Sequence, residues 1–130
     1  MEDPPRLDAE QTRKDLARVV TALFEKWHLE DDEQLTLLGL DRNSRHELPE
    51  YRSGERALPN NPDTLGRVSY LLGIHRGLRL LFPEDQAIRF GWVKMRNRAF
   101  DGCTALDVML REGPDGVARV ARLVDAQLGR

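Results

Sequence analysis

Apolar side chains recur at helical spacing along most of this 130-residue chain, and no alternating strand pattern interrupts them. The first stripe consists of Leu16, Val19, Val20, Leu23, Phe24 and Trp27. The last consists of Val117, Val120, Leu123, Val124 and Leu128. An apolar residue every three or four positions lies on one face of an α-helix, and that face must be covered by another element. The sequence therefore predicts an all-α protein of six or seven helices, without internal repeats.

Turn-forming residues predict where several of these helices begin and end. Asp8 followed by Gln11 is expected to cap the first helix, because this spacing allows reciprocal hydrogen bonds at a helix start. Asp41 is expected to cap a short helix over residues 42–48. Proline lacks a backbone donor and clashes with the preceding turn, so Pro49 is expected to end or kink that helix.

The turn-rich segment 52–63 is expected to be a loop between two groups of helices. Asn61 as cap and Pro62 at the first helical position then start a long helix. Gly73 is expected to mark a break within it. These signals predict a flexible tail at residues 1–7 and two helical domains, at residues 8–75 and 76–130.

The composition is that of an ordinary globular protein, with 40% apolar and 32% charged residues and a net charge of −2. This charge argues against strong non-specific binding to nucleic acids, which depends on many phosphate contacts. Arginine makes up 17 of the 20 basic residues and suits phosphate, carboxylate or guanine partners, although codon usage in a GC-rich genome explains the bias equally well. No apolar run reaches the roughly 20 residues of a membrane helix, and a cytoplasmic location is expected.

The residues offer little to an enzyme. The three histidines fall on separate segments without metal-ligand spacing, and no phosphate-binding glycine loop is present. Cys103 follows a glycine turn, and a lone cysteine there is expected to be a small buried residue rather than a nucleophile. We therefore expect no catalytic residue, no metal and no cofactor.

A short helix, a turn at Gly39 and a second capped helix give residues 33–48 the layout of a helix-turn-helix. In such a unit the second helix enters the major groove and presents its first side chains to base edges. The residues expected to face bases are Arg42, Asn43, Ser44, Arg45 and His46. Those expected on phosphates are Arg52, Ser53 and Arg56. The same layout also occurs as an ordinary corner between helices, and neighbouring glutamates and Pro49 argue against tight DNA binding.

The run from Trp92 to Leu128 has a fixed order of turn and apolar residues. After Trp92 comes a turn, Arg96-Asn97-Arg98-Ala99-Phe100-Asp101-Gly102. A short helix follows, Thr104-Ala105-Leu106-Asp107-Val108-Met109-Leu110. A break at Gly113 then precedes a last amphipathic helix. Asp107 is placed to hold a cap or turn. Trp92 and Phe100 are large apolar anchors, and such aromatics belong either to a core or to an interface.

This order resembles the C-terminal toxin-binding domain of the Xre/MbcA/ParS-type antitoxins. A wider stretch, roughly residues 14–128, resembles the same family with its Xre-type helix-turn-helix. The segments that carry this wider resemblance are Leu37-Leu38-Gly39-Leu40, Tyr51-Arg52-Ser53-Gly54-Glu55, Leu65-Gly66-Arg67-Val68-Ser69-Tyr70-Leu71-Leu72-Gly73-Ile74 and Leu80-Leu81-Phe82-Pro83. The resemblance implies an antitoxin that covers the active-site entrance of a toxin. That toxin is commonly a RES-domain enzyme that degrades NAD⁺, or in some systems an ADP-ribosyltransferase.

The resemblance also implies contact residues and partners. The toxin-binding residues it implies are Trp92, Arg96, Asn97, Arg98, Phe100, Asp101, Gly102, Leu128 and Arg130. An arginine of the tail suits a pocket built for a phosphate-bearing dinucleotide. Many relatives carry proline at the position of Arg98 and glycine at that of Asp101, so the turn is expected to differ in detail. Operator DNA, a homodimer and a larger toxin–antitoxin complex are the other expected partners.

Two alternatives remain open on the residues alone. One is a stand-alone helix-turn-helix regulator of transcription, which senses a ligand through an apolar pocket of its C-terminal domain and has no toxin partner. The other is a protein-interaction module with a degenerate helix-turn-helix, which suits the acidic net charge and Pro49 better. A salt titration of DNA binding separates the two, because phosphate contacts give a steep dependence on salt.

Overall fold

The computed structural model describes residues 6 and 8–129. Within them the regular structure is helical, apart from one isolated antiparallel bridge between Arg96 and Thr104. The α-helices are α1 (Glu10–Lys26), α2 (Asp31–Leu38), α3 (Leu48–Ser53), α4 (Pro62–Leu81), α5 (Gln86–Gly91), α6 (Ala105–Glu112) and α7 (Pro114–Gln127). Three short 3-10 helices are η1 (Arg42–Glu47), η2 (Trp92–Lys94) and η3 (Arg98–Phe100). The predicted all-α fold is confirmed, and the predicted tail lies outside the described residues except for Arg6.

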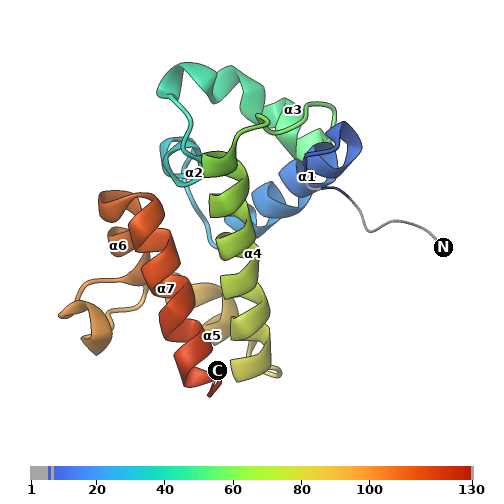
Figure 1. The fold of residues 1–130 in the computed structure, drawn as a ribbon. Coiled ribbons are helices and arrows are strands. Elements are labelled where there is room, and N and C mark those ends of the chain that lie inside the picture. Colours follow the sequence, from blue (N-terminus) through green and yellow to red (C-terminus); the bar gives the residue numbers. More distant parts are fainter. Residues whose placement is uncertain (1–5, 7, 130) are drawn as a thin grey trace.

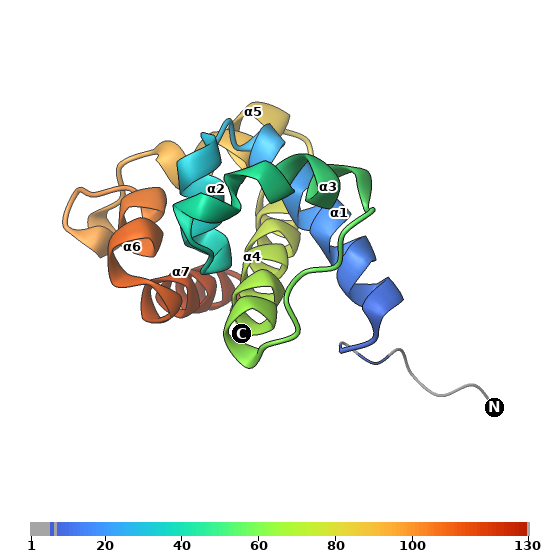
Figure 2. The ribbon, with the colours of Figure 1, turned by 90° about the horizontal axis from the view of Figure 1, so that it is seen from above.

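Helix α4 is the central element of the molecule (Figure 1). Helices α1, α2 and α3 surround its first half, and α7 runs beside its second half (Figures 1 and 2). Buried apolar residues from both halves of the chain form one continuous core. The predicted domain boundary between residues 75 and 76 falls inside α4, and the division into two domains remains a prediction.

The predicted break at Gly73 is wrong, because α4 continues through this residue to Leu81. Leu71 and Ile74, on either side, are fully buried. Their packing outweighs the roughly 1 kcal/mol by which glycine weakens a helix interior. The start of α4 is as predicted, since the Asn61 side chain accepts a hydrogen bond from the Thr64 amide at 2.7 Å.

The predicted cap at Asp8 is also wrong. Helix α1 begins at Glu10, and Ala9 occupies the cap position without a side-chain hydrogen bond. The Asp8 carboxylate instead pairs with Arg6 at 3.1 Å, and the Asp8 carbonyl accepts a hydrogen bond from Arg13 Nε at 3.0 Å. Arg6 therefore takes the carboxylate oxygens that a capping box would use.

The segment after α2 departs from the predicted helix over residues 42–48. Gly39 ends α2 in the left-handed conformation, with φ of +74°, and Asp41 Oδ1 accepts a hydrogen bond from the Asn43 amide at 2.8 Å, both as predicted. The helix that follows is the 3-10 helix η1 rather than an α-helix. Pro49 does not end it but lies in the first turn of α3, where proline's missing donor costs nothing.

Within the described residues, no helix combines the length and the apolar character that crossing a membrane requires.

Candidate functional site

The segment between η2 and α6, residues 94–103, forms a loop that projects from the α6–α7 side of the molecule, drawn in orange in Figures 1 and 2. We refer to it as the 94–103 loop. Asn97 organises it through four hydrogen bonds. Its amide donates to the Cys103 carbonyl at 3.0 Å, and its carbonyl accepts from Phe100 and Gly102 at 3.0 Å. Its side chain accepts from the Ala99 amide at 3.0 Å. The predicted tight turn at Asn97 and Gly102 is confirmed.

Two residues of this turn adopt left-handed backbone conformations. Asp101 has φ of +56° and Gly102 has φ of +86°. Aspartate tolerates this region better than most residues other than glycine, which explains how Asp101 occupies a left-handed position in the turn.

A capping box joins the 94–103 loop to α6. Thr104 Oγ1 accepts a hydrogen bond from the Asp107 amide at 3.0 Å, and the Asp107 carboxylate accepts one from the Thr104 amide at 3.1 Å. These hydrogen bonds from Thr104 hold the pKa of the Asp107 carboxyl below its usual value. Asp107 thus has the capping role that the sequence predicts, and it fixes the end of the loop to a rigid helix.

The two aromatic anchors lie beneath the loop rather than on its surface. Trp92 is 8% exposed and Phe100 is 4% exposed. The Arg119 guanidinium lies 5.2 Å from the centre of the Phe100 ring and pairs with Glu112 at 3.0 Å. In the free chain these aromatics support the loop, while its exposed side chains are available to a partner.

The predicted toxin-binding residues divide by exposure. Arg96, Arg98, Asp101 and Gly102 are exposed, whereas Asn97 and Leu128 are half-buried. Arg130 lies outside the described residues. Lys94, Met95 and Ala99 are further exposed residues of the loop that the sequence did not predict, and Lys94 and Met95 have the larger side chains. An apolar residue between two basic ones, immediately after a buried Trp-Val pair, is the signal that could have found them.

The predicted DNA-binding residues lie on η1, on α3 and, for Arg56, in the loop just after α3, and these two helices lie at the opposite end of the molecule from the C-terminus (Figure 1). Arg42, Asn43, Arg45 and His46 are exposed, and Ser44 is half-buried. Ser53 is exposed but bonds through Oγ to the Glu50 carbonyl at 3.0 Å. The structure therefore brings the predicted residues to one connected surface.

The arginines of this surface are paired with carboxylates. Arg42 lies 3.9 Å from Asp32, and Arg45 donates a hydrogen bond to the same carboxylate. The hydrogen bond from Arg45 holds the pKa of the Asp32 carboxyl below its usual value. Asp32 belongs to α2, so the helix before the glycine turn supplies the charge that occupies both arginines.

The arginines expected on phosphates are paired in the same way. Arg52 Nη2 lies 2.8 Å from Asp31, and the guanidinium also pairs with Glu25 at 3.4 Å. Arg56 pairs with Glu50. Residues 25–56 carry nine carboxylates and five basic side chains, whereas residues 77–130 carry seven carboxylates and nine basic side chains. The basic surplus lies in the C-terminal part of the chain rather than at the predicted DNA-binding surface.

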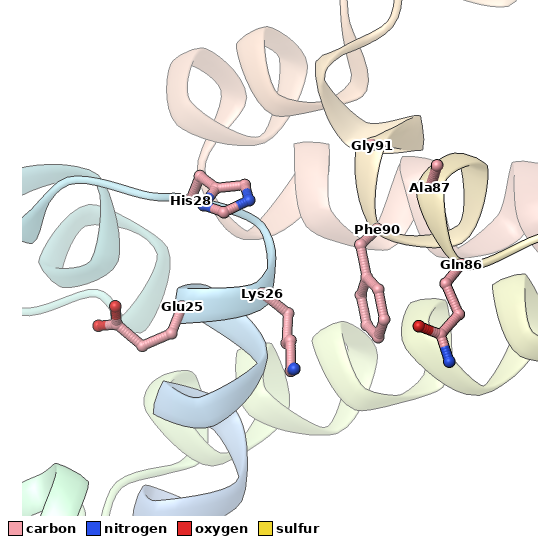
Figure 3. A pocket seen from close by; sticks show the side chains of 7 residues that line it. All are labelled: Glu25, Lys26, His28, Gln86, Ala87, Phe90 and Gly91. Atoms are coloured by element: carbon pink, nitrogen blue, oxygen red, sulfur yellow. The ribbon is translucent and has the colours of Figure 1, made fainter.

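Two adjoining cavities lie between α1, α4 and α5. The first, of about 560 Å³, is lined mostly by polar residues and glycine from the end of α1 and from α5 (Figure 3). Lys26 and Phe90 point into it, with the ammonium 5.8 Å from the ring centre, while Glu25 points away (Figure 3). The second, of about 380 Å³, shares Lys26 and Phe90 and has an apolar floor that includes Leu23 and Leu72.

The histidines and the cysteine do not assemble into a site. Among the described residues, no group of three or more histidine, cysteine, aspartate or glutamate side chains could hold a metal ion. Cys103, the last residue of the 94–103 loop, is half-buried, and its Sγ lies 3.8 Å from Arg111 Nη2.

Comparison with known proteins supports the C-terminal part as the functional site. Residues 77–130 match the family described as the antitoxin Xre/MbcA/ParS C-terminal toxin-binding domain. The chain is also 34% identical over 107 residues to the uncharacterized protein y4oB of Sinorhizobium fredii (strain NBRC 101917 / NGR234), covering 82% of this chain and 79% of that protein. The matched region contains the 94–103 loop, the Thr104 capping box, the end of α4 from Gly77 and the whole of α7. Residues 77–130 therefore belong to the Xre/MbcA/ParS C-terminal toxin-binding domain family of antitoxins, and the chain as a whole is related to protein y4oB.

Proposed function

We propose that this chain is the antitoxin of a type II toxin–antitoxin pair and neutralises its toxin by covering the active-site entrance. The observation that carries the proposal is the family match over residues 77–130, the part of the chain that holds the 94–103 loop. This loop offers a rigid, exposed surface that buried aromatics support from below. Binding to such a surface needs no catalytic residue, so inhibition by occlusion is the mechanism that fits.

We further propose that the toxin is of the RES type and degrades NAD⁺, or is a related ADP-ribosylating enzyme. The resemblance of the Trp92–Leu128 order to antitoxins of such toxins supports this assignment. The end of α7, with Leu128 beside it, lies on the same matched domain.

Co-expression with each adjacent reading frame tests both proposals. The expected result is a complex that co-purifies with this chain and contains one small neighbouring protein. Cellular NAD⁺ is then measured with the neighbour induced alone and with both proteins induced. A fall in NAD⁺ that this chain prevents supports the RES assignment. A stable complex with unchanged NAD⁺ and no ADP-ribosylated protein contradicts the toxin class but not the antitoxin function.

We also propose that the chain, as a homodimer, binds the promoter of its own operon through η1 and α3, and that the free protein binds weakly. The layout of α2, Gly39 and η1 and the exposure of Arg42, Asn43 and Arg45 support binding. The excess of carboxylates in residues 25–56 and the ion pairs of the arginines support weak DNA binding. A DNA phosphate must displace a carboxylate at each arginine before it can bind there.

Binding to the upstream DNA fragment, measured by fluorescence anisotropy over a range of salt concentrations, tests this part. Light scattering on the same samples gives the oligomeric state. A negative salt slope together with a dimer supports the proposal. Affinity that does not depend on salt, or that is equal for an unrelated fragment of the same length, contradicts specific DNA binding.

A stand-alone, ligand-responsive regulator is the second candidate function, and the cavity of about 380 Å³ is the observation that favours it, although α1 and α4 line most of this cavity and only Phe90 comes from the predicted C-terminal domain. Its apolar floor and the cation Lys26 would suit a small organic anion. This candidate predicts specific DNA binding and no toxic neighbour. The antitoxin proposal, in contrast, predicts that a neighbouring gene encodes a toxic protein, whether or not DNA binding is strong.

A further inference from the structure

We propose that the 94–103 loop binds an acidic surface of the toxin and that its arginines govern the rate at which the two proteins associate. Met95 enters an apolar depression within that acidic surface. This inference rests on the proposed antitoxin function and adds the chemistry of the partner's contact surface to it.

The first observation is that the two arginines of the loop have no ion-pair partner among the described residues. Arg96 and Arg98 are both exposed, and neither guanidinium pairs with a carboxylate of any residue that the structure describes. The four arginines of η1, of α3 and of the loop just after α3, in contrast, each pair with an aspartate or glutamate. An arginine without an internal partner is available to an external carboxylate without first breaking an ion pair.

The second observation is that the loop is held in one shape before any partner arrives. Asn97 fixes the backbone between the two arginines through its four hydrogen bonds. The capping box at Thr104 fixes the end of the loop, and Phe100 is buried beneath it. Because little backbone freedom remains to be lost, binding through this loop has a small ordering cost.

The third observation is the exposed apolar side chain among the cations. Met95 is 51% exposed and stands between Lys94 and Arg96. Methionine and arginine are both enriched at protein interfaces, and the flexible methionine side chain adapts to irregular apolar cavities. The combination fits a partner surface with an apolar depression and carboxylates around it.

Charge favours an acidic partner over a neutral one. Residues 94–104 carry three basic side chains and one carboxylate, that of Asp101. The Lys94 ammonium donates to the His28 carbonyl at 2.7 Å, whereas Arg96 and Arg98 make no such bond to the part of the chain that the structure describes. Complementary charges at an interface raise the association rate, and that rate falls as salt screens them.

The test is the association rate with the purified cognate toxin, measured by stopped-flow fluorescence at low and near-physiological salt. The variant is Arg96→Gln with Arg98→Gln. The matched control is Arg42→Gln with Arg45→Gln, which removes the same charge from the same protein at η1. We expect the loop variant to associate about tenfold more slowly at low salt and to lose most of its salt dependence. We expect the control to stay within about twofold of the unchanged protein.

Two further variants separate the elements of the proposal. Arg96→Lys with Arg98→Lys keeps the charge and should retain most of the association rate. Met95→Ala should leave the association rate nearly unchanged and raise the dissociation rate about tenfold. All three replaced side chains are exposed, and circular dichroism checks that each variant remains folded.

The proposal is overturned if the loop variant associates at the unchanged rate, or if both glutamine variants slow association equally. Equal slowing would mean that only the overall charge matters. Either result leaves the antitoxin function intact, because the toxin still binds. Failure of the unchanged protein to bind any toxic neighbour contradicts the antitoxin function itself.

Discussion

Replacing Gly77 by alanine tests how α7 is positioned against α4. A Cβ built at Gly77 would lie 2.3 Å from Val124 Cγ1 and 3.4 Å from Leu128 Cδ1. Val124 is buried and its β-branched side chain has little rotamer freedom, so it cannot swing aside. The added methyl group must push α7 away from α4, along with the rest of the toxin-binding domain.

Gly73 on the same helix provides the matched control, because a Cβ there meets nothing within 4 Å. Alanine is favoured over glycine in a helix interior by about 1 kcal/mol at either position. Overpacking typically costs about 1–3 kcal/mol, and only Gly77→Ala incurs it. The difference in unfolding free energy between the two variants therefore isolates the clash, at about 1–3 kcal/mol.

Thermal unfolding followed by circular dichroism measures this difference. For a domain of this size, 1 kcal/mol corresponds to about 4 °C, so Gly77→Ala should melt roughly 4–12 °C below Gly73→Ala. Combining Gly77→Ala with Val124→Ala should recover part of the loss, since it removes the atom that clashes. If Gly77→Ala melts at or above Gly73→Ala, the close packing of α7 on α4 is not what positions the toxin-binding domain.

Three further predictions concern other contacts. Gly116→Ala should destabilise the fold more than Gly77→Ala in the same melting experiment, because its Cβ would meet the Val108 carbonyl oxygen at 2.4 Å and a backbone atom cannot change rotamer. Thr104→Ala removes the hydroxyl that accepts the Asp107 amide and should lower the unfolding free energy in urea by about 1 kcal/mol; no change would contradict the capping role. Burial lowers the pKa of His75 from its usual 6.5, so the unfolded chain takes up the proton first as the pH falls. Stability should therefore fall between pH 7 and pH 5, and melts of His75→Gln over that range should show a weaker dependence.

Features set by neighbours in the sequence were predictable. The Asn61 cap and the Asn97 turn depend on side chains that bond within a few residues of themselves, and the helix end at Gly39 depends on glycine's freedom to adopt a positive φ. All three occur as predicted. Gly77 shows the opposite case. As a glycine within a helical pattern it predicts only a weakened helix, whereas its role depends on α7, which crosses it from nearly fifty residues further along the chain.

The candidate surfaces show the same distinction. In the sequence, the residue types at η1 predict a basic surface that reads DNA bases. Glutamates close by in the sequence already argue against that prediction. The structure adds Asp31 and Asp32, which reach Arg52 and Arg45 only because α2 folds back against η1 and α3. The exposure of Met95 likewise could not be derived from periodicity, because it follows from the projection of the loop rather than from a helical face.

Growth of cells that express the neighbouring reading frames tests the central claim most directly. Each neighbour is induced alone, with this chain, and with a version of this chain that carries Gly116→Ala as a destabilised control. We expect that one neighbour, when induced alone, arrests growth. We expect that this chain restores growth and that the destabilised control restores it less. If no neighbour arrests growth, or if growth remains arrested with the unchanged chain present, the toxin-neutralising function is contradicted.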